Sequence, residues 1–299
     1  MARALGWLVM LWRGLMARLA LRWLGPALLV VVLAGPLLPL LAPPAALAAA
    51  PAPVMAAPPP APASLQQLFE RALAASRDGR FSEALPLWDQ LLERNPEDAA
   101  AWSNRGNVRL ALGDPLGAIA DQGQAIALDP LSADPHLNRG TAEEALARWS
   151  AAEADYRWIL ERPETGSDVQ ASALYNLGNV QGSLGDWAAA RGSFEAAADL
   201  RPGFAMARAS AALADFQLGE LERAERSLRS LIRRYPLFAD PRAALTALLW
   251  QRGAGGEAES HWVSAAGLDP RYRQQEWLLK VRRWPPAPVQ ALQQFLELS

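Results

Sequence analysis

The chain has 299 residues, with 29 Lys and Arg against 31 Asp and Glu, a formal net charge of −2 and a hydrophobic fraction of 51%. It contains no cysteine, which excludes disulfides, thiolate metal ligands and cysteine nucleophiles. Lys280 is the only lysine, and electrostatic binding to phosphates needs a basic stripe, so we do not expect nucleic acid as a partner.

Residues 1–50 have the organisation of an export signal. Four arginines and no acidic residue precede an apolar run from Leu24 to Ala50, which ends in small residues. This order is typical of a secretory signal peptide, and no twin arginine precedes the run, so a Sec-type route is expected. The alternative is a retained membrane anchor, because the run approaches the ~20 residues that span a bilayer. Three prolines inside the run argue against that alternative.

Residues 51–64 form an Ala/Pro-rich linker with too few large apolar groups to be buried. Ser64 and Gln67 have the spacing of a capping box, which predicts that the first helix begins directly after the linker. The opening tripeptide Met1-Ala2-Arg3 recurs at Met16, so Met16 is a second candidate for the start of the chain.

From residue 65 to 272 a pattern of alanines and prolines recurs. Successive alanines are 34, 34, 38, 34 and 34 residues apart by subtraction: Ala84, Ala118, Ala152, Ala190, Ala224 and Ala258. A proline closes each unit eleven or twelve residues later: Pro96, Pro130, Pro163, Pro202, Pro236 and Pro270. A fixed period of this length predicts a solenoid of stacked supersecondary units.

The two clearest copies resemble the tetratricopeptide repeat (TPR). They are AWSNRGNVRLALGDPLGAIADQGQAIALDP from Ala101 and ALYNLGNVQGSLGDWAAARGSFEAAADLRP from Ala173. The resemblance implies an all-α, right-handed solenoid of about six helix-turn-helix repeats, with an A and a B helix in each. The repeats are expected at 65–98, 99–132, 133–168, 169–204, 205–238 and 239–272, and the third contains four extra residues.

Within repeat two, Gly106 and Ala118 are expected to be small because two antiparallel helices approach closely there. Gly113 is expected to form the turn between the helices, and Ala147 takes the equivalent place in repeat three.

We expect no enzyme, no cofactor and no metal site. His136 and His261 lie in different repeats, without the spacing of a metal-binding helix pair, and the position of His136 is one where the TPR pattern usually has tryptophan. Adjacent Glu143 and Glu144 point about 100° apart on a helix and are expected to form a solvated face rather than an acid pair.

The TPR resemblance implies that the A helices line a concave groove that holds an extended peptide or a helix of a protein partner. Asn104, Asn138 and Asn176 are equivalent positions in successive repeats; further inward positions are Asn107, Thr141 and Asn179. Side-chain amides at one repeat interval can bracket a peptide backbone. The alternative is that these amides only satisfy backbone groups of their own repeats.

Towards the carboxyl end the groove positions become apolar: Met206, Leu213, Phe216 and Trp250. A hydrophobic segment of the partner is expected there. Residues 273–299 are expected to form a helix and tail that cap repeat six, ending at Pro285-Pro286; the alternative is partner docking.

These features predict an exported, non-enzymatic TPR scaffold or assembly adaptor. The signal and the Trp284-Pro285-Pro286 tail resemble lumenal TPR proteins of photosynthetic membranes, so the thylakoid lumen and the periplasm are the expected locations. The alternative is a membrane-tethered structural component of an envelope or thylakoid complex, with the amino-terminal apolar segment retained.

Overall fold

The computed structural model describes residues 64–298. The predicted signal at 1–50, the linker at 51–63 and the second start at Met16 lie outside the described residues. No helix in the described range is both long and apolar enough to cross a membrane. At Ser64 the predicted capping box is confirmed: its hydroxyl accepts from the Gln67 amide, while the Gln67 side chain accepts from the Ser64 amide.

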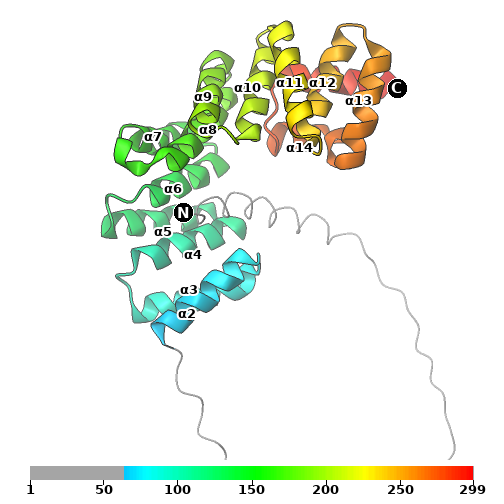
Figure 1. Ribbon diagram of the computed structural model, residues 1–299. Helices are drawn as coiled ribbons and strands as arrows, with labels where there is room; N and C mark the ends of the chain where they lie inside the picture. The colour runs from blue at the N-terminus through cyan, green and yellow to red at the C-terminus, as the bar shows by residue number, and fades with distance from the viewer. Residues whose placement is uncertain (1–63, 299) are drawn as a thin grey trace, which may run out of the picture.

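Twelve helices of the described part pair as six helical hairpins that follow one another along a curved array (Figure 1). The A helices are α2 Leu65–Arg77, α4 Ala99–Ala111, α6 Ala133–Ala145, α8 Ser167–Ser183, α10 Ala205–Gln217 and α12 Ala239–Gln251. The B helices are α3 Phe81–Arg94, α5 Pro115–Leu128, α7 Trp149–Leu160, α9 Trp187–Leu200, α11 Leu221–Arg234 and α13 Gly255–Leu268. The predicted all-α solenoid is confirmed.

Small residues allow the two helices of a repeat to approach closely. A Cβ atom added to Gly106 would lie 2.7 Å from Gln122 Nε2 and 3.2 Å from the carbonyl oxygen of Ala118. In repeat four a Cβ on Gly178 would lie 2.6 Å from the Phe194 ring. The close approach predicted at Gly106 and Ala118 is therefore confirmed.

The turn between the helices requires a left-handed residue. Gly113 has φ +86°, which costs glycine nothing because it lacks a Cβ. Ala147 adopts φ +54° at the equivalent turn of repeat three, where the methyl group makes this conformation unfavourable. The repeat geometry imposes the conformation in spite of that local cost.

The four extra residues of repeat three form a short 3-10 turn, η1 Pro163–Thr165, and an additional turn at the start of α8. Helix α8 has 17 residues, whereas the other A helices have 13. The expected boundary between 168 and 169 therefore falls inside α8 instead of before it. The insertion lengthens a helix without disturbing the order of the hairpins.

The carboxyl-terminal segment differs from the predicted single capping helix. It consists of η2 Pro270–Arg273, α14 Gln275–Lys280, an irregular stretch 281–285 and α15 Pro286–Leu298. Instead of ending a helix, Pro286 begins one, because proline suits the first helical position. Helix α15 packs chiefly against α12 and α10, which are both A helices (Figure 1).

Candidate functional site

The concave surface of the array is formed by the A helices. Consecutive A helices contact each other in the pairs α2–α4, α4–α6, α6–α8 and α10–α12. Elements that lie on the inside of a curve are closer together than those on the outside, so the A helices line the inner side. The groove of this chain is therefore built from one face of each A helix.

The three equivalent asparagines lie on this side but make different contacts. Asn138 Nδ2 donates to Ser103 Oγ at 3.3 Å and so joins repeats two and three. The Asn104 amide donates to the Ala100 carbonyl of its own helix at 2.8 Å. Asn176 is 6% exposed, and no described residue forms a hydrogen bond with its side chain. Its amide retains hydrogen-bonding capacity for a ligand.

The second set of polar groove residues is partly used inside the fold. Asn107 is buried and its Oδ1 accepts from Gln122 Nε2 at 3.1 Å. Thr141 Oγ1 donates to the Leu137 carbonyl of the same helix at 3.0 Å. Asn179 is half-buried on α8. Internal satisfaction, the alternative considered above, therefore applies to Asn107 and Thr141.

The apolar end of the predicted groove is occupied by the chain itself. Leu213 and Phe216 are each 2% exposed and belong to the hydrophobic core of the carboxyl-terminal half. Trp250 packs edge-on against Phe295 of α15, with ring centroids 5.7 Å apart. Only Met206 remains partly exposed. The expectation that Leu213, Phe216 and Trp250 are open to a partner is wrong for this conformation, because α15 covers them.

Asp240, at the start of α12, anchors the segment that leads into α15. Its Oδ1 accepts from Tyr272 Oη at 2.8 Å, from Arg282 Nε at 2.9 Å and from Trp284 Nε1 at 3.0 Å. Burial alone would lower the Arg282 pKa, but the attraction of Asp240 outweighs it and holds that pKa above its usual value. Asp240 therefore fixes the start of the tail in the concave surface.

Glu143 and Glu144 do not form the expected solvated face. They are 8% and 6% exposed, respectively. Glu144 accepts from the Tyr156 hydroxyl and pairs with Arg283 of the tail, while Glu143 pairs with Arg148. The expectation was wrong because the tail and helix α7 cover this end of α6, which the helical period alone could not indicate.

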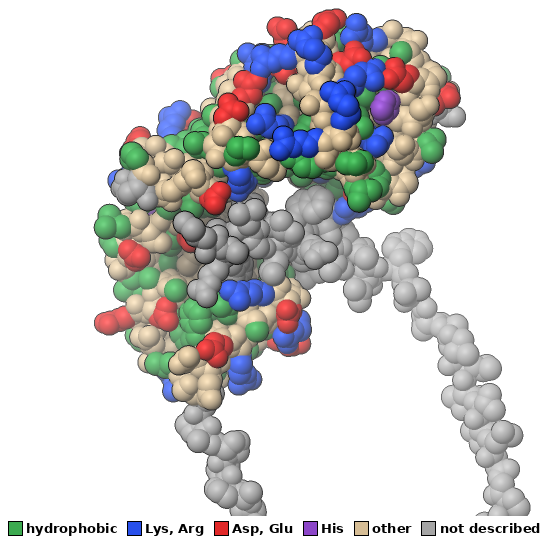
Figure 2. All heavy atoms as spheres, in the orientation of Figure 1, with side chains coloured by type: hydrophobic (Ala, Val, Ile, Leu, Met, Phe, Trp, Pro, Cys, Tyr) green, Lys and Arg blue, Asp and Glu red, His purple; other side chains and the backbone are tan. Residues whose placement is uncertain are grey.

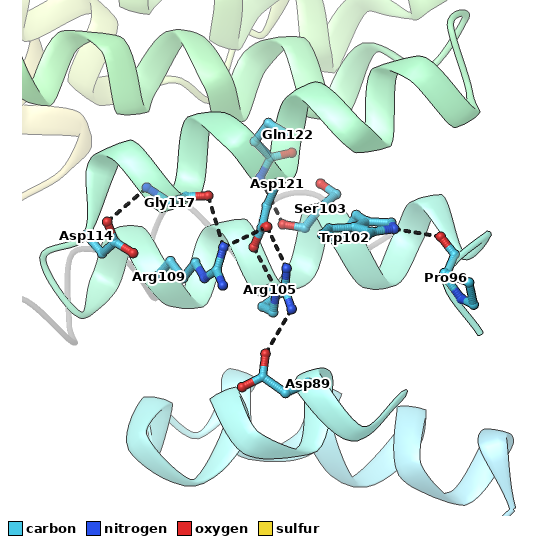
Figure 3. A network of polar contacts seen from close by, with 10 residues as sticks. All are labelled: Asp89, Pro96, Trp102, Ser103, Arg105, Arg109, Asp114, Gly117, Asp121 and Gln122. Atoms are coloured by element: carbon cyan, nitrogen blue, oxygen red, sulfur yellow. Dashed lines mark hydrogen bonds and ion pairs between the residues drawn. The ribbon is translucent and has the colours of Figure 1, made fainter. Parts of the chain in front are cut away.

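Repeats two and three are stiffened by arginine–aspartate pairs between the helices. Arg105 donates to both oxygens of Asp121 at 2.8 Å and to Asp89 of the preceding repeat at 2.9 Å (Figure 3). Arg109 also donates to Asp121, at 2.8 Å (Figure 3). These bonds replace the apolar packing of an ordinary repeat interior and hold repeat one against repeat two.

His136 belongs to the corresponding pair in repeat three. Its ring stacks on Trp158 with centroids 3.8 Å apart, and its Nδ1 lies 2.8 Å from Asp155 Oδ1. Burial alone would raise the Asp155 pKa, but hydrogen bonds from Arg139 and His136 outweigh it and lower that pKa. His136 thus has a packing role. Among the described residues no group of three His, Cys, Asp or Glu side chains could hold a metal ion.

The sequence reasoning missed a pocket on repeat one. A cavity of about 520 Å³ is lined by α2 together with Leu91 and Asp98, and the α2 residues include Phe69 and Leu73. These two precede Ser103 and Asn107 by one repeat (103 − 69 = 34; 107 − 73 = 34), so they occupy the same groove positions. Applying the repeat interval backwards from the polar groove residues would have found them.

A second pocket, of about 590 Å³, lies between α9, α10 and α11, and it includes Arg208, Arg223 and Asp215. Arg223 pairs with Glu195 and lies 3.2 Å from Asp215. Burial raises the Asp215 pKa to about 6 in spite of the nearby Arg191. Figure 2 shows basic and acidic side chains interspersed over the carboxyl-terminal repeats on the visible face. The charges of this region are balanced among themselves.

Comparison with known proteins agrees with this architecture. Models of the tetratricopeptide repeat match residues 69–135, 137–205 and 210–237. The chain belongs to the tetratricopeptide repeat family. It is thus a TPR interaction scaffold, in which stacked helical hairpins present a concave surface to protein partners.

Curated relatives match only part of the TPR array. Mitochondrial import receptor subunit TOM34 of Rattus norvegicus is 31% identical over 131 residues, which cover 41% of this chain and 41% of the relative. The TPR repeat-containing thioredoxin TDX of Arabidopsis thaliana is 34% identical over 85 residues, or 28% of this chain and 22% of the relative. The chain thus spans about two fifths or less of the length of these relatives.

Solved structures share the fold. A structure of Pseudomonas aeruginosa pilF superimposes with a TM-score of 0.60 and 18% identity, over 69% of this chain and 92% of that one. PilW, described as a type IV pilus biogenesis factor, gives 0.56 and 19% identity over 76% and 98%. Cut9 in the APC/C Cut9–Hcn1 assembly gives 0.61 and 16% over 78% and 43%. At this level of identity the likeness concerns the fold alone.

Proposed function

We propose that this TPR protein is an exported, non-enzymatic adaptor that binds an extended peptide or a helix of a protein partner on the concave surface of repeats one to four. The observation that carries the proposal is a combination of two features on the same side of the array. Repeat one has an apolar pocket at Phe69 and Leu73, and repeat four has the unpartnered amide of Asn176.

The chemistry of these features suits a peptide. An apolar pocket takes a side chain, while an amide with free donor and acceptor atoms takes a backbone N–H or C=O group. Asn138, whose amide makes only a long bond to Ser103 at 3.3 Å, lies on the helix between them. A ligand that crosses α2, α4, α6 and α8 would meet an apolar anchor first and polar side chains afterwards.

The proposed binding surface excludes repeats five and six, since α15 covers their apolar positions. This restricts the partner to the amino-terminal two thirds of the array. The residues that separate the two halves of the groove are Glu144 and Arg283, whose ion pair crosses from α6 to the tail.

Export is part of the same proposal and rests on the residues before the array. The arginines, the apolar run and the small residues of the amino terminus support a Sec-type signal that delivers the chain to a periplasm or a thylakoid lumen. The proline-rich linker after it would leave the array free of the signal.

The test is affinity capture of the tagged chain from its native cells, followed by mass spectrometry of the partners and of the amino terminus of the bait. We expect a partner that stays bound to wild type and to Val263→Ala, a control at a residue 72% exposed on the outer helix α13. The same partner should be lost from the triple variant Leu73→Ala, Asn138→Ala, Asn176→Ala. Retention of the partner by a folded triple variant would reject the groove.

The amino terminus of the same bait tests export. A mature chain that begins near residue 49 or 51 is the expected result. A bait that still carries the segment 24–41, recovered only with membrane neighbours, would contradict the soluble adaptor and support a tethered component.

A further inference from the structure

We propose that the concave surface of repeats five and six is a second docking site for an amphipathic helix, and that α15 is its resident occupant, which a partner helix of the same pattern can replace. This site is separate from the open surface of repeats one to four. The chain itself therefore displays the ligand chemistry that the second site recognises.

The contacts of α15 define the first part of that chemistry. Its buried side chains recur along one stripe: Val289, Leu292 and Phe295 are each at most 1% exposed. They pack against Leu213, Phe216 and Trp250 in one core cluster. On the opposite side Gln290, Gln294 and Glu297 are exposed. Such a stripe at i, i+3 and i+6 laid along A helices is the helix-in-groove mode of recognition.

Polar contacts ahead of α15 define the second part. Arg282 reaches Asp240, Arg283 reaches Glu144, and the Ala287 amide donates to Gln217 Oε1 at 2.8 Å. Three A helices thus present oxygen acceptors to the stretch that precedes the apolar stripe. A partner suited to this site carries cationic residues directly before an amphipathic helix.

The closed arrangement contains local costs. Arg283 has φ +54°, in a region that side chains with a Cβ rarely adopt. Three buried polar atoms at the contact between the tail and the array have no hydrogen-bond partner: Asp240 Oδ2, Trp277 Nε1 and Gln293 Nε2. Buried polar atoms are normally satisfied, so this contact is less complete than an ordinary core. A ligand that satisfies these atoms has a means of competing with α15.

The position of α15 in the chain permits exchange. It follows the last repeat and the irregular stretch 281–285, so its release does not unthread any hairpin. Helices α10 and α12 contact each other and their own B helices independently of α15. The array can therefore stay stacked while the groove of repeats five and six is open.

A labelled peptide of residues 281–299 tests exchange by fluorescence anisotropy on the full chain. We expect no binding to wild type, where α15 occupies the site. We expect at least tenfold tighter binding to the variant Leu292→Ala, Phe295→Ala, whose own tail is weakened while the groove is unchanged. The matched control Gln290→Ala, Gln294→Ala changes the exposed side of α15 and should behave as wild type. A folded tail-weakened variant that does not bind the peptide would overturn the proposal.

Hydrogen exchange of the wild-type chain gives a second test that needs no variant. Amides of α15 should exchange at least tenfold faster than those of α12, because a replaceable helix opens before the array unfolds. Equal protection of α15 and α12 would show that the tail is an inseparable part of the core and would overturn the proposal. Neither test depends on a partner for repeats one to four, so the two proposals can fail separately.

Discussion

Arg283 in the tail pairs with Glu144 on α6, although 139 residues separate them in the chain. The Glu144 side chain is 4% exposed and accepts a further hydrogen bond from Tyr156. The curvature of the array brings repeat three close to the segment that follows repeat six. This ion pair therefore links the middle of the groove to its occupied end.

Removing Arg283 should destabilise the fold because it leaves a buried carboxylate without its cation. We expect Arg283→Ala to lower the free energy of unfolding by about 2–4 kcal/mol. Denaturant unfolding of the single variants and of Arg283→Ala, Glu144→Gln together gives the coupling energy of the pair. Additive effects of the two substitutions would contradict a direct interaction.

Asp240 should be among the most sensitive polar residues of the chain. It is 0% exposed and accepts from three side chains. Asp240→Asn leaves Arg282 buried without a counter-charge, so we expect a loss of about 3–5 kcal/mol in the free energy of unfolding. The control Asp199→Asn, at a side chain 78% exposed, should stay within about 0.5 kcal/mol of wild type. Equal effects of the two substitutions would contradict the anchoring role.

The left-handed turn of repeat three offers a stabilising substitution. Ala147 is exposed and has φ +54°, so Ala147→Gly removes the steric cost of its Cβ. We expect the free energy of unfolding to rise by about 0.5–1 kcal/mol. The reverse change at the equivalent turn, Gly113→Ala, should lower it by a similar amount. Thermal unfolding of both variants checks the sign, and a destabilised Ala147→Gly would disagree with the described turn.

Asp215 should give the stability of the protein a measurable pH dependence. Its pKa is raised to about 6 in the folded state from 3.8 for the free group, so the folded state binds more protons between these values. The contribution of Asp215 to stability is therefore largest below about pH 4 and is lost as the pH rises through 6.

The variant Asp215→Asn removes this dependence. Relative to wild type it should gain about 2–3 kcal/mol between pH 4 and pH 7, since one pKa unit corresponds to about 1.4 kcal/mol. Urea unfolding at several pH values measures the difference. A stability difference that does not change with pH would show that Asp215 titrates at its ordinary value. Asp199→Asn on the same pocket serves as the exposed control.

Part of the candidate site could be predicted from the repeat interval. Equivalence by 34 residues placed Asn104, Asn138 and Asn176 on corresponding helices, and the same interval leads back to Phe69 and Leu73. What the interval could not indicate is which amides stay free. Asn107 bonds to Gln122, whereas Asn176 bonds to no described residue, and the difference depends on the side chain that faces each one.

The sequence by itself determined the hairpins, their order and their tight contacts, because these depend on residues close together in the chain. Gly106 against Ala118, the turn at Gly113 and the capping box at Ser64 all join positions at most 12 residues apart. Only the tertiary structure decided that α15 lies in the groove and that Glu144 is buried under Arg283. Those contacts arise from the accumulated curvature of six stacked repeats, to which every interface contributes and which no local pattern encodes.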